Sequence, residues 1–496
     1  MNTILALDQG TSSTRGIVFD QNLNMLGTAQ QEFPQYFPKP GWVEHDAGEI
    51  WQSVLSTGRD AIEKSDGLAS DLSAIGITNQ RETVVIWDRK TGVPVHRAIV
   101  WQDRRTADHM EALREGGKEP LVQERTGLVL DAYFSASKLH WLLRETPDGH
   151  ARATAGDLAA GTIDSWLIFR LTNGRVHRTD ITNASRTMLM NLRTGEWDPG
   201  MLALFDIPVA MLPEICPTSG VFGICSPEHF GAEIPITAAV GDQQAALFGQ
   251  LCTGRGMVKC TYGTGCFMLM FVGTEAVPSE NRLLTTVAWK IGDNPCEYAL
   301  EGSVFMGGAS IQWLRDGLGI IQTASDVNDL AAKVPDSGGV VLVPGFTGLG
   351  APYWDASARG SIFGLSRGTT GAHIARATLD GIAFQVTDLL AAMERDAGMK
   401  ITRLRADGGA SASNLLMQIQ ADLLGVTVER PKSIESTAIG AAMMAGLGVG
   451  IWPDLDALRQ IRQVDREFPP TLPARERRDR MSRWKNAVNR TRHWQS

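Results

Sequence analysis

Three short segments combine glycines, hydroxyl side chains and a carboxylate in a way that suits phosphate binding. Residues 8–14 read DQGTSST after an apolar run, residues 261–265 read TYGTG, and residues 407–414 read DGGASASN. Such a turn can surround phosphate oxygens with backbone N–H groups and hydroxyls, while Asp8 holds a hydrated magnesium ion. In the third segment the glycines admit close backbone approach, and a following helix N-terminus favours a polar ligand.

Each of these segments, taken alone, is also typical of an ordinary turn. Together, and spread over both halves of the chain, the three are less easily explained in that way. The chain contains no G-x-x-x-x-G-K-[ST] sequence, so a P-loop is excluded as the phosphate cradle. The segments therefore predict a phosphate site to which both halves contribute.

The loop at residues 78–83, with the sequence TNQRET, carries the groups that a small polyol requires. Its adjacent Arg81 and Glu82 supply hydrogen-bond donors and acceptors for hydroxyl groups, and the indole of Trp101 can cover the carbon side. A surface ion pair beside a core tryptophan is the alternative explanation.

Asp242 follows the apolar run at residues 236–240 and a single glycine. A carboxylate at the end of a strand is well placed to take the proton from an attacking hydroxyl. Aspartate is also a favoured helix N-cap, so a purely structural role is the alternative.

Short apolar runs predict the strands that position these residues. Runs at 4–7 and 16–19, with a third after Asn24, predict an antiparallel meander. Runs at 257–260 and 266–270 repeat this arrangement around the second glycine-rich segment. Two such hairpins, one in each half, indicate an internally duplicated α/β fold.

Helices are predicted between the strands. One spans residues 47–64, with Asp46 as its N-cap and Glu49 completing a capping box. A helix-like stretch at 243–251 runs into a glycine-rich turn, which predicts two domains, 1–250 and 251–496. Further strands are predicted at 73–78 and 84–88, and further helices at 372–396 and 414–424.

Length and composition agree with a two-domain enzyme. A chain of 496 residues is too long for one hydrophobic core, and 43% hydrophobic residues, 21% charged residues and 52 glycines fit the α/β class. The net charge of −8, without a basic stripe, makes nucleic acid an unexpected partner. The arginine-rich segment 475–480 interleaves both signs of charge and is typical of an exposed helix face.

Several features favour a cytoplasmic protein without a transmembrane segment. The N-terminus lacks a basic segment and carries Asp8, which is untypical of a signal peptide. The uncharged run 436–453 is rich in glycine and alanine and predicts a buried helix and turn. No zinc-site spacing links the cysteines, which we interpret as reduced and mostly buried: Cys216, Cys225, Cys252, Cys260, Cys266 and Cys296.

Longer segments resemble the FGGY family of carbohydrate kinases, and within it the members that phosphorylate glycerol. The resemblance implies the actin-like ATPase architecture, in which two duplicated, ribonuclease H-like domains close around the nucleotide. It also implies the conversion of ATP and glycerol to ADP and sn-glycerol 3-phosphate with Mg²⁺. It rests on ALDQGTSSTR (6–15), PKPGWVEHD (38–46), GITNQRET (76–83), AIVWQDRRT (98–106), TNASRTML (182–189), GDQQAALFGQLC (241–252), TYGTGCFMLM (261–270), ASIQWLRD (309–316), FTGLGAPYWD (346–355) and DGGA (407–410).

The resemblance further implies roles for individual residues, with Asp8 organising the metal and Asp242 acting as general base. The residues implied to hold glycerol are Arg81, Glu82, Trp101, Tyr133, Asp242, Gln243 and Phe267. Those implied to bind the nucleotide are Thr11, Ser12, Ser13, Arg15, Thr264, Gly308, Gln312, Gly409 and Ser413. At Ser413 the family commonly has asparagine, so the chain departs from the family pattern at this adenosine contact.

The resemblance is weaker at residues 226–233, which read SPEHFGAE. Some relatives have a glycine-rich loop here that binds fructose 1,6-bisphosphate, and because this chain lacks it we do not expect that effector. Other relatives have a His-Phe segment that a sugar phosphotransferase carrier protein phosphorylates. His229 is the corresponding candidate, with a surface-loop histidine as the alternative. The family also implies a homodimer or homotetramer.

Two other functions fit part of the sequence. Another kinase of the same family, acting on a pentulose or on gluconate, is disfavoured by the aromatic walls that Trp101 and Phe267 predict, since these suit a three-carbon polyol. A non-catalytic, actin-like ATP-binding switch would use the phosphate segments but would leave Asp242 and the Arg81–Glu82 pair without a purpose.

Overall fold

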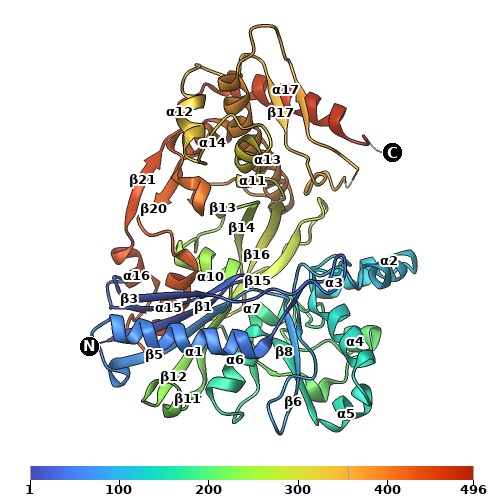
Figure 1. The fold of residues 1–496 in the computed structure, drawn as a ribbon, viewed down its shortest axis with the longest axis vertical. Coiled ribbons are helices and arrows are strands. Elements are labelled where there is room, and N and C mark those ends of the chain that lie inside the picture. The colour runs from blue at the N-terminus through green and yellow to red at the C-terminus, as the bar shows by residue number, and fades with distance from the viewer. Residues whose placement is uncertain (1, 356, 495–496) are drawn as a thin grey trace.

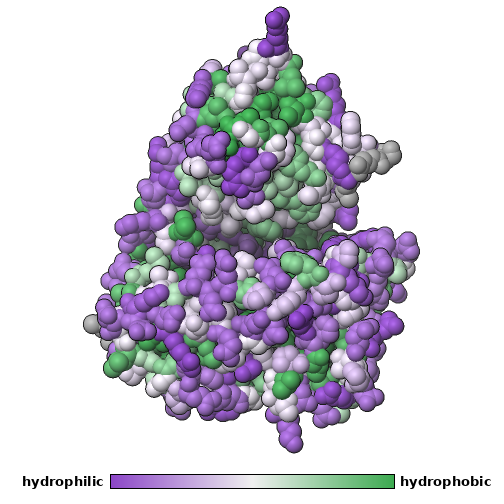
Figure 2. Space-filling model, viewed as in Figure 1, coloured by the Kyte–Doolittle hydropathy of each residue, from purple (hydrophilic) through white to green (hydrophobic). Residues whose placement is uncertain are grey.

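The computed structural model describes residues 2–355 and 357–494 and consists of two lobes (Figure 1). The lower lobe in Figure 1 is built around a six-stranded sheet and the upper lobe around a seven-stranded sheet. The surface is hollowed along the line where the lobes meet (Figure 2).

The six-stranded sheet contains the predicted meander, with β1 (Thr3–Gln9), β2 (Ser13–Phe19) and β3 (Met25–Glu32) running antiparallel. Strand β5 (Leu72–Asn79) pairs parallel with β1, and β12 (Ile234–Gly241) pairs parallel with β5. The edge strand β11 (Ser219–Cys225) is antiparallel to β12. Because parallel strands end at the same edge of a sheet, Asp8, the loop after Asn79 and Asp242 emerge side by side.

The seven-stranded sheet repeats this pattern. Strands β13 (Met257–Tyr262), β14 (Cys266–Gly273) and β16 (Glu297–Val304) form a second antiparallel meander. Strand β19 (Arg403–Asp407) is parallel to β13, and β20 (Val428–Pro431) is parallel to β19. The order and directions match those of the first sheet, so the predicted duplication is confirmed. The two edge strands of the seven-stranded sheet are β15 (Leu284–Trp289) and β21 (Val464–Phe468).

The predicted helices form where expected. Helix α1 (Ala47–Lys64) begins after Asp46, whose Oδ1 accepts from the backbone N–H groups of Gly48 and Glu49. The predicted capping box is wrong, because the Glu49 carboxylate accepts from the Tyr36 hydroxyl at 2.9 Å instead. Helices α13 (Gly371–Ala397) and α14 (Asn414–Leu424) also match their predicted ranges.

Helices α10 (Asp242–Gly249) and α15 (Ser436–Gly448) cross where the lobes join (Figure 1). A Cβ on Gly249 would lie 2.0 Å from the Ser436 carbonyl oxygen, and one on Gly440 would lie 1.9 Å from that of Ala245. Only glycine lets the two backbones approach so closely. Helix α15 also packs against β1, β5 and β12, although it belongs to the second half of the sequence. One continuous core therefore joins the lobes at this crossing.

The outer elements cover the sheets. Beside the first sheet lies a four-stranded sheet in the order β4-β7-β6-β8, formed by β4 (Glu44–His45), β7 (Ala98–Ile99), β6 (Val84–Asp88) and β8 (Leu158–Thr162). The remaining helices are α2 (Ala107–Glu115), α3 (Glu119–Thr126), α4 (Ser135–Glu145), α5 (Gly149–Ala155), α6 (Ile163–Leu171), α7 (Ile181–Ala184), α8 (Pro199–Phe205), α9 (Pro227–Phe230), α11 (Gly308–Asp316), α12 (Asp326–Ala331), α16 (Leu455–Ile461) and α17 (Ala474–Thr491). The short strands β9 (Arg178–Asp180) and β10 (Glu214–Cys216) pair, as do β17 (Val341–Val343) and β18 (Ser361–Phe363).

Helix α17 contains the arginine-rich segment 475–480, whose side chains lie mostly on the exposed face as predicted, while Trp484 is buried against Phe384. The six cysteines are free, and four of them are buried. Within the two described ranges, no helix combines the length and the apolar character needed to cross a membrane.

Candidate active site

The first phosphate segment forms the tip of the β1–β2 hairpin. Gly10 N–H donates to the Ser13 carbonyl at 2.9 Å, which closes the turn and leaves the Ser12 side chain exposed. Arg15 follows on β2, where its Nη1 lies 2.8 Å from Glu435 Oε2. Burial raises the pKa of Asp8 to about 7, with Asp242 and Glu435 adding to the rise and Arg15 opposing it.

The second and third phosphate segments meet in the upper lobe. The N-terminal N–H groups of α11 close on the β13–β14 hairpin, with Gly308 N–H donating to the Gly263 carbonyl at 2.8 Å. Gly408 adopts φ +84° and would place a Cβ 2.7 Å from the Tyr262 carbonyl oxygen, so the third segment requires glycine to reach this hairpin. Exposed residues along this surface include Thr264, Gln312 and Gly409.

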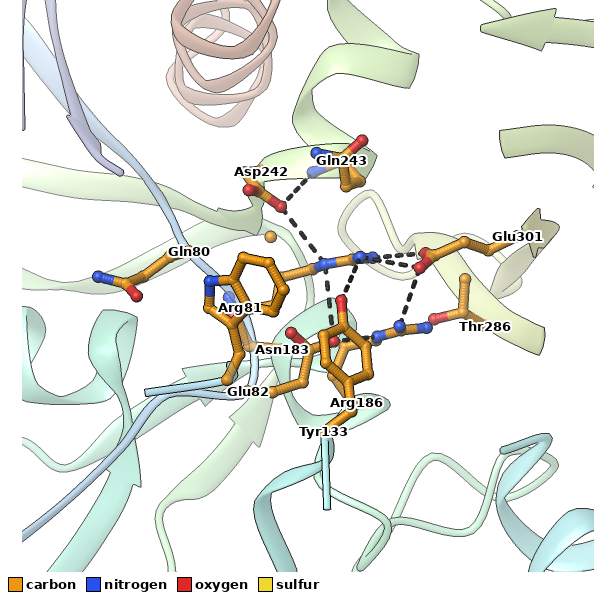
Figure 3. A network of polar contacts seen from close by, with 12 residues as sticks. Gln80, Arg81, Glu82, Tyr133, Asn183, Arg186, Asp242, Gln243, Thr286 and Glu301 are labelled. Carbon is orange, nitrogen blue, oxygen red and sulfur yellow. Dashed lines mark hydrogen bonds and ion pairs between the residues drawn. The ribbon is translucent and has the colours of Figure 1, made fainter. Parts of the chain in front are cut away.

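Arg81 lies at the centre of a buried charge network between the lobes (Figure 3). Its Nη1 and Nη2 donate to the two carboxylate oxygens of Glu301, on β16, at 2.6 and 2.9 Å. Its Nε lies 3.3 Å from Asp242 Oδ1 and makes no hydrogen bond with any residue that the structure describes. The guanidinium is therefore held by the second lobe, and its Nε side faces Asp242.

Arg186, just after α7, completes the network. Its Nε donates to Glu82 Oε1 at 2.7 Å, and its Nη2 donates to Glu301 Oε1 at 2.9 Å. Burial alone would raise the pKa of Glu301, but Arg186 and Arg81 outweigh it and lower that pKa to about 2. The four side chains are at most 4% exposed, so the alternative explanation of Arg81–Glu82 as a surface ion pair is wrong, and the two residues belong to a buried network. Arg186 and Glu301 are site candidates that the sequence patterns did not predict.

Two aromatic side chains stand beside this network. The rings of Trp101 and Tyr133 meet edge to face at 5.6 Å, and the Tyr133 hydroxyl lies 3.4 Å from Arg81 Nη2. Trp101 Nε1 donates to Thr11 Oγ1 at 3.0 Å, which connects the polyol candidates to the first phosphate hairpin. Tyr133 is held in turn by the buried Lys138, whose Nζ donates to the carbonyls of residues 132, 133 and 134.

Asp242 is the first residue of α10, and Gly241 is the N-cap, so the alternative role of Asp242 as N-cap is wrong. Its Oδ1 accepts from the Gln243 N–H at 2.6 Å, and its side chain is 32% exposed. Burial raises the pKa of Asp242, while Arg81 and Lys259 oppose the rise. Lys259, on β13, donates from Nζ to Gln243 Oε1 at 2.7 Å. A carboxylate between two lobes, with both cations beside it, can accept a proton from a bound hydroxyl.

Two other candidates, Phe267 and Ser413, lie elsewhere in the upper lobe. Phe267 is half-buried on β14, directly opposite Thr261 of β13. Ser413 is the N-cap of α14, where its Oγ accepts from the Leu416 N–H at 3.0 Å and donates to Asn328 Oδ1. Because its hydroxyl already has these partners, it is less available to a nucleotide than an exposed side chain would be.

His229 does not lie in a surface loop. It belongs to the short helix α9, is only 9% exposed, and packs edge to face on Trp51 at 5.0 Å. Its Nε2 lies 3.1 Å from the Arg170 carbonyl and 3.0 Å from Asn173 Oδ1. A phosphorylating partner would have to displace these contacts to reach Nε2.

Two lobes of the same strand order, each presenting a glycine- and hydroxyl-rich hairpin to their common interface, define an actin-like ATPase architecture. The N-terminal domain model of the FGGY family of carbohydrate kinases matches residues 3–249, and the C-terminal domain model matches residues 258–449. The chain belongs to the FGGY family of carbohydrate kinases.

Relatives of known name cover the full chain. A glycerol kinase of Rhodopirellula baltica is 57% identical over 495 residues, 100% of this chain and 92% of its own length. A glycerol kinase of Deinococcus radiodurans is 57% identical over 492 residues, 99% of this chain and 98% of its own. Among solved structures, a Plasmodium falciparum glycerol kinase with ADP superposes with a TM-score of 0.94 at 38% identity, covering 99% of this chain and 98% of that one.

Proposed function

We propose that the protein transfers the γ-phosphoryl group of ATP to a terminal hydroxyl of glycerol, giving ADP and sn-glycerol 3-phosphate. The observation that carries this proposal is the buried Arg81–Glu82 pair, which adjoins Asp242 and lies beside Tyr133, itself packed on Trp101. The full-length similarity to glycerol kinases supports the same substrate.

In this proposal, glycerol lies among Arg81, Glu82 and the aromatic rings. Arg81 Nε, which lies 3.3 Å from Asp242 Oδ1 but makes no hydrogen bond with the described residues, is the donor proposed to bind a hydroxyl, and Gln243 follows Asp242 at the start of α10. The carbon backbone packs against Trp101, Tyr133 and Phe267, since aromatic faces suit C–H groups better than water does. Asp242 accepts the proton of the hydroxyl as it attacks the phosphorus in line.

ATP lies across the two hairpins in this proposal, so that residues 1–250 and 251–496 close on it from both sides. Phosphoryl transfer depends mainly on alignment and charge neutralisation, and closure would exclude water as a competing acceptor. The residues proposed to contact the nucleotide are Thr11, Ser12, Ser13, Arg15, Thr264, Gly308, Gln312, Gly409 and Ser413.

The surroundings of Asp8 fit a magnesium ion. In phosphoryl-transfer sites Mg²⁺ is usually held by one or two carboxylates together with waters and phosphates, so a single carboxylate beside a phosphate hairpin is sufficient. Burial, Asp242 and Glu435 all disfavour the ionised form of Asp8, while Arg15 favours it, so a bound cation would help to hold this buried carboxylate ionised. When bound, the ion would neutralise charge on the transferred phosphate.

Magnesium binding is expected to weaken as the pH falls, because protons compete with the metal for Asp8. With a carboxyl pKa of about 7, about tenfold more Mg²⁺ should be needed at pH 6 than at pH 8. The rise in melting temperature with Mg²⁺, in the presence of ADP, measures this. Asp8→Asn should lose the response, and Asp60→Asn, on the exposed face of α1, should retain it. An unchanged response in Asp8→Asn would exclude Asp8 as a metal ligand.

The proposed function is tested by ADP release from MgATP with glycerol, dihydroxyacetone, xylulose, gluconate or no acceptor. We expect a strong preference for glycerol. If the protein prefers xylulose or gluconate, the residues proposed to bind the nucleotide stand, but the proposal that glycerol is the substrate is wrong. ADP release that does not depend on an acceptor would instead favour an actin-like switch.

A further inference from the structure

Two charged side chains of the upper lobe lie in one row of its sheet and face the lower lobe. Lys259 of β13 is opposite Leu269 of β14, and Leu269 is opposite Glu301 of β16. Residues directly opposite each other on neighbouring strands point to the same face. Leu269 belongs to the core that joins the lobes, together with Ala245 and Phe248 of α10. Lys259 and Glu301 therefore flank the apolar contact between the lobes.

Glu301 fixes the guanidinium of Arg81. It accepts from both Nη atoms, and Gln244 and Tyr133 lie at 3.1 and 3.4 Å from the same group. These contacts leave Nε as the buried donor without a hydrogen-bond partner among the described residues. Figure 3 shows Arg81 stretched between Glu301 and Asp242. The second lobe thus decides which edge of Arg81 faces a substrate.

Lys259 fixes the side-chain amide of Gln243. A lysine ammonium group only donates hydrogen bonds, so the amide atom 2.7 Å from its Nζ must be the oxygen. The amide nitrogen of Gln243, with its two donors, is then left for another acceptor. Lys259 itself is fully buried, so its charge is placed where solvent screens it little.

We infer that Lys259 and Glu301 are positioning residues that orient Gln243 and Arg81 for the polyol, so that the second lobe assembles a substrate site built on the first. This inference rests on the proposed function. Long side chains such as arginine and glutamine lose conformational freedom when they are ordered, and prior ordering by buried partners removes that cost from substrate binding. Lys259 and Glu301 contact Gln243 and Arg81, which bind the substrate in this inference, and do not contact the substrate themselves.

Lys259 has a second, electrostatic effect on Asp242. The charged groups that act on the Asp242 carboxyl come from four elements, namely Arg81 after β5, Lys259 on β13, Glu301 on β16 and Asp8 on β1. Those that face Lys259 are Asp407, Asp242, Cys260 and Arg81. Removing the Lys259 charge removes one of the two cations that hold Asp242 ionised. The acid limb of the pH–rate profile should then move to higher pH.

The test compares KM for glycerol with KM for ATP in Glu301→Gln and Lys259→Met. We expect KM for glycerol to rise about 10- to 100-fold, the scale of a misplaced binding group, while KM for ATP changes by less than about threefold. Lys259→Met should also shift the acid limb of kcat/KM upward, and Lys259→Arg, which keeps the charge, should leave that limb in place. Glu301→Asp, which keeps the charge on a shorter side chain, serves if Glu301→Gln does not fold.

Two control variants match the charge changes. The control for Glu301→Gln is Glu297→Gln, because Glu297 lies on the same strand but its carboxylate accepts from Trp289 of its own sheet. The control for Lys259→Met is Lys400→Met, which removes an ammonium group that is 87% exposed. Both control variants should keep the wild-type KM values for glycerol and for ATP. Equal increases in both KM values, or no change in either, would overturn the positioning role. Failure of the wild-type protein to phosphorylate glycerol would instead overturn the proposed function, so the two failures are distinguishable.

Discussion

Replacing Asp242 by asparagine is expected to lower kcat by about 10²- to 10⁴-fold, the usual contribution of a general base. The side chain keeps its size, and the amide oxygen can still accept from the Gln243 N–H, so the start of α10 should be undisturbed. Glycerol should still bind, because Arg81 and Glu82 remain fixed by Glu301 and Arg186. Only the proton acceptor is removed.

Two measurements separate binding from turnover in Asp242→Asn. Steady-state ADP release gives kcat, and the glycerol-dependent rise in melting temperature gives binding. Asp60→Asn makes the same chemical change on the exposed face of α1 and should keep full activity. A near-normal kcat in Asp242→Asn would mean that another group takes the proton.

Replacing Arg81 by alanine is expected to destabilise the protein by about 3–5 kcal/mol, the cost of breaking a buried ion pair from one side. Glu301 would keep only Arg186, and Asp242 would lose the nearer of the cations that favour its ionised form. The same variant should lose measurable glycerol binding. Its effect therefore exceeds that of any exposed arginine.

Denaturant unfolding checks the stability of Arg81→Ala, with Arg459→Ala as the control. Arg459 pairs with Asp456 on the surface, where the two side chains are 50% and 76% exposed, and its loss should cost at most about 1 kcal/mol. Equal destabilisation by the two substitutions would contradict the buried-network interpretation.

Much of the fold could be predicted from local patterns. Helix α1 was placed at its observed bounds because Asp46 caps it and its apolar residues recur at helical spacing. The two hairpins were evident because glycines and hydroxyls interrupt short apolar runs in the same way in each half. Such features depend on neighbours in the sequence, which a single chain displays directly.

The buried partners of the candidate site could not be predicted, because nothing local identifies them. Glu301 meets Arg81 across 220 positions of sequence, and its strand reads EYALEGSV. Lys259 similarly interrupts the apolar strand MVKCTY. A charge in the middle of a largely apolar strand was the available signal, since a buried charge needs a partner. The same limitation explains the capping-box error at Glu49, whose carboxylate binds Tyr36 rather than its own helix.

The crossing of α10 and α15 has a consequence for biosynthesis. Residues of β1 such as Ile4 and Ala6 share a core with α15, which begins more than 400 positions later at Ser436. When only the first half of the chain has been synthesised, one face of the six-stranded sheet therefore still lacks the helix α15 that covers it in the folded protein. Domains usually complete their folding as synthesis proceeds from the N-terminus. In this chain the first sheet stays partly uncovered until α15 has been synthesised, and an apolar face left open in this way is the kind of surface that chaperones bind.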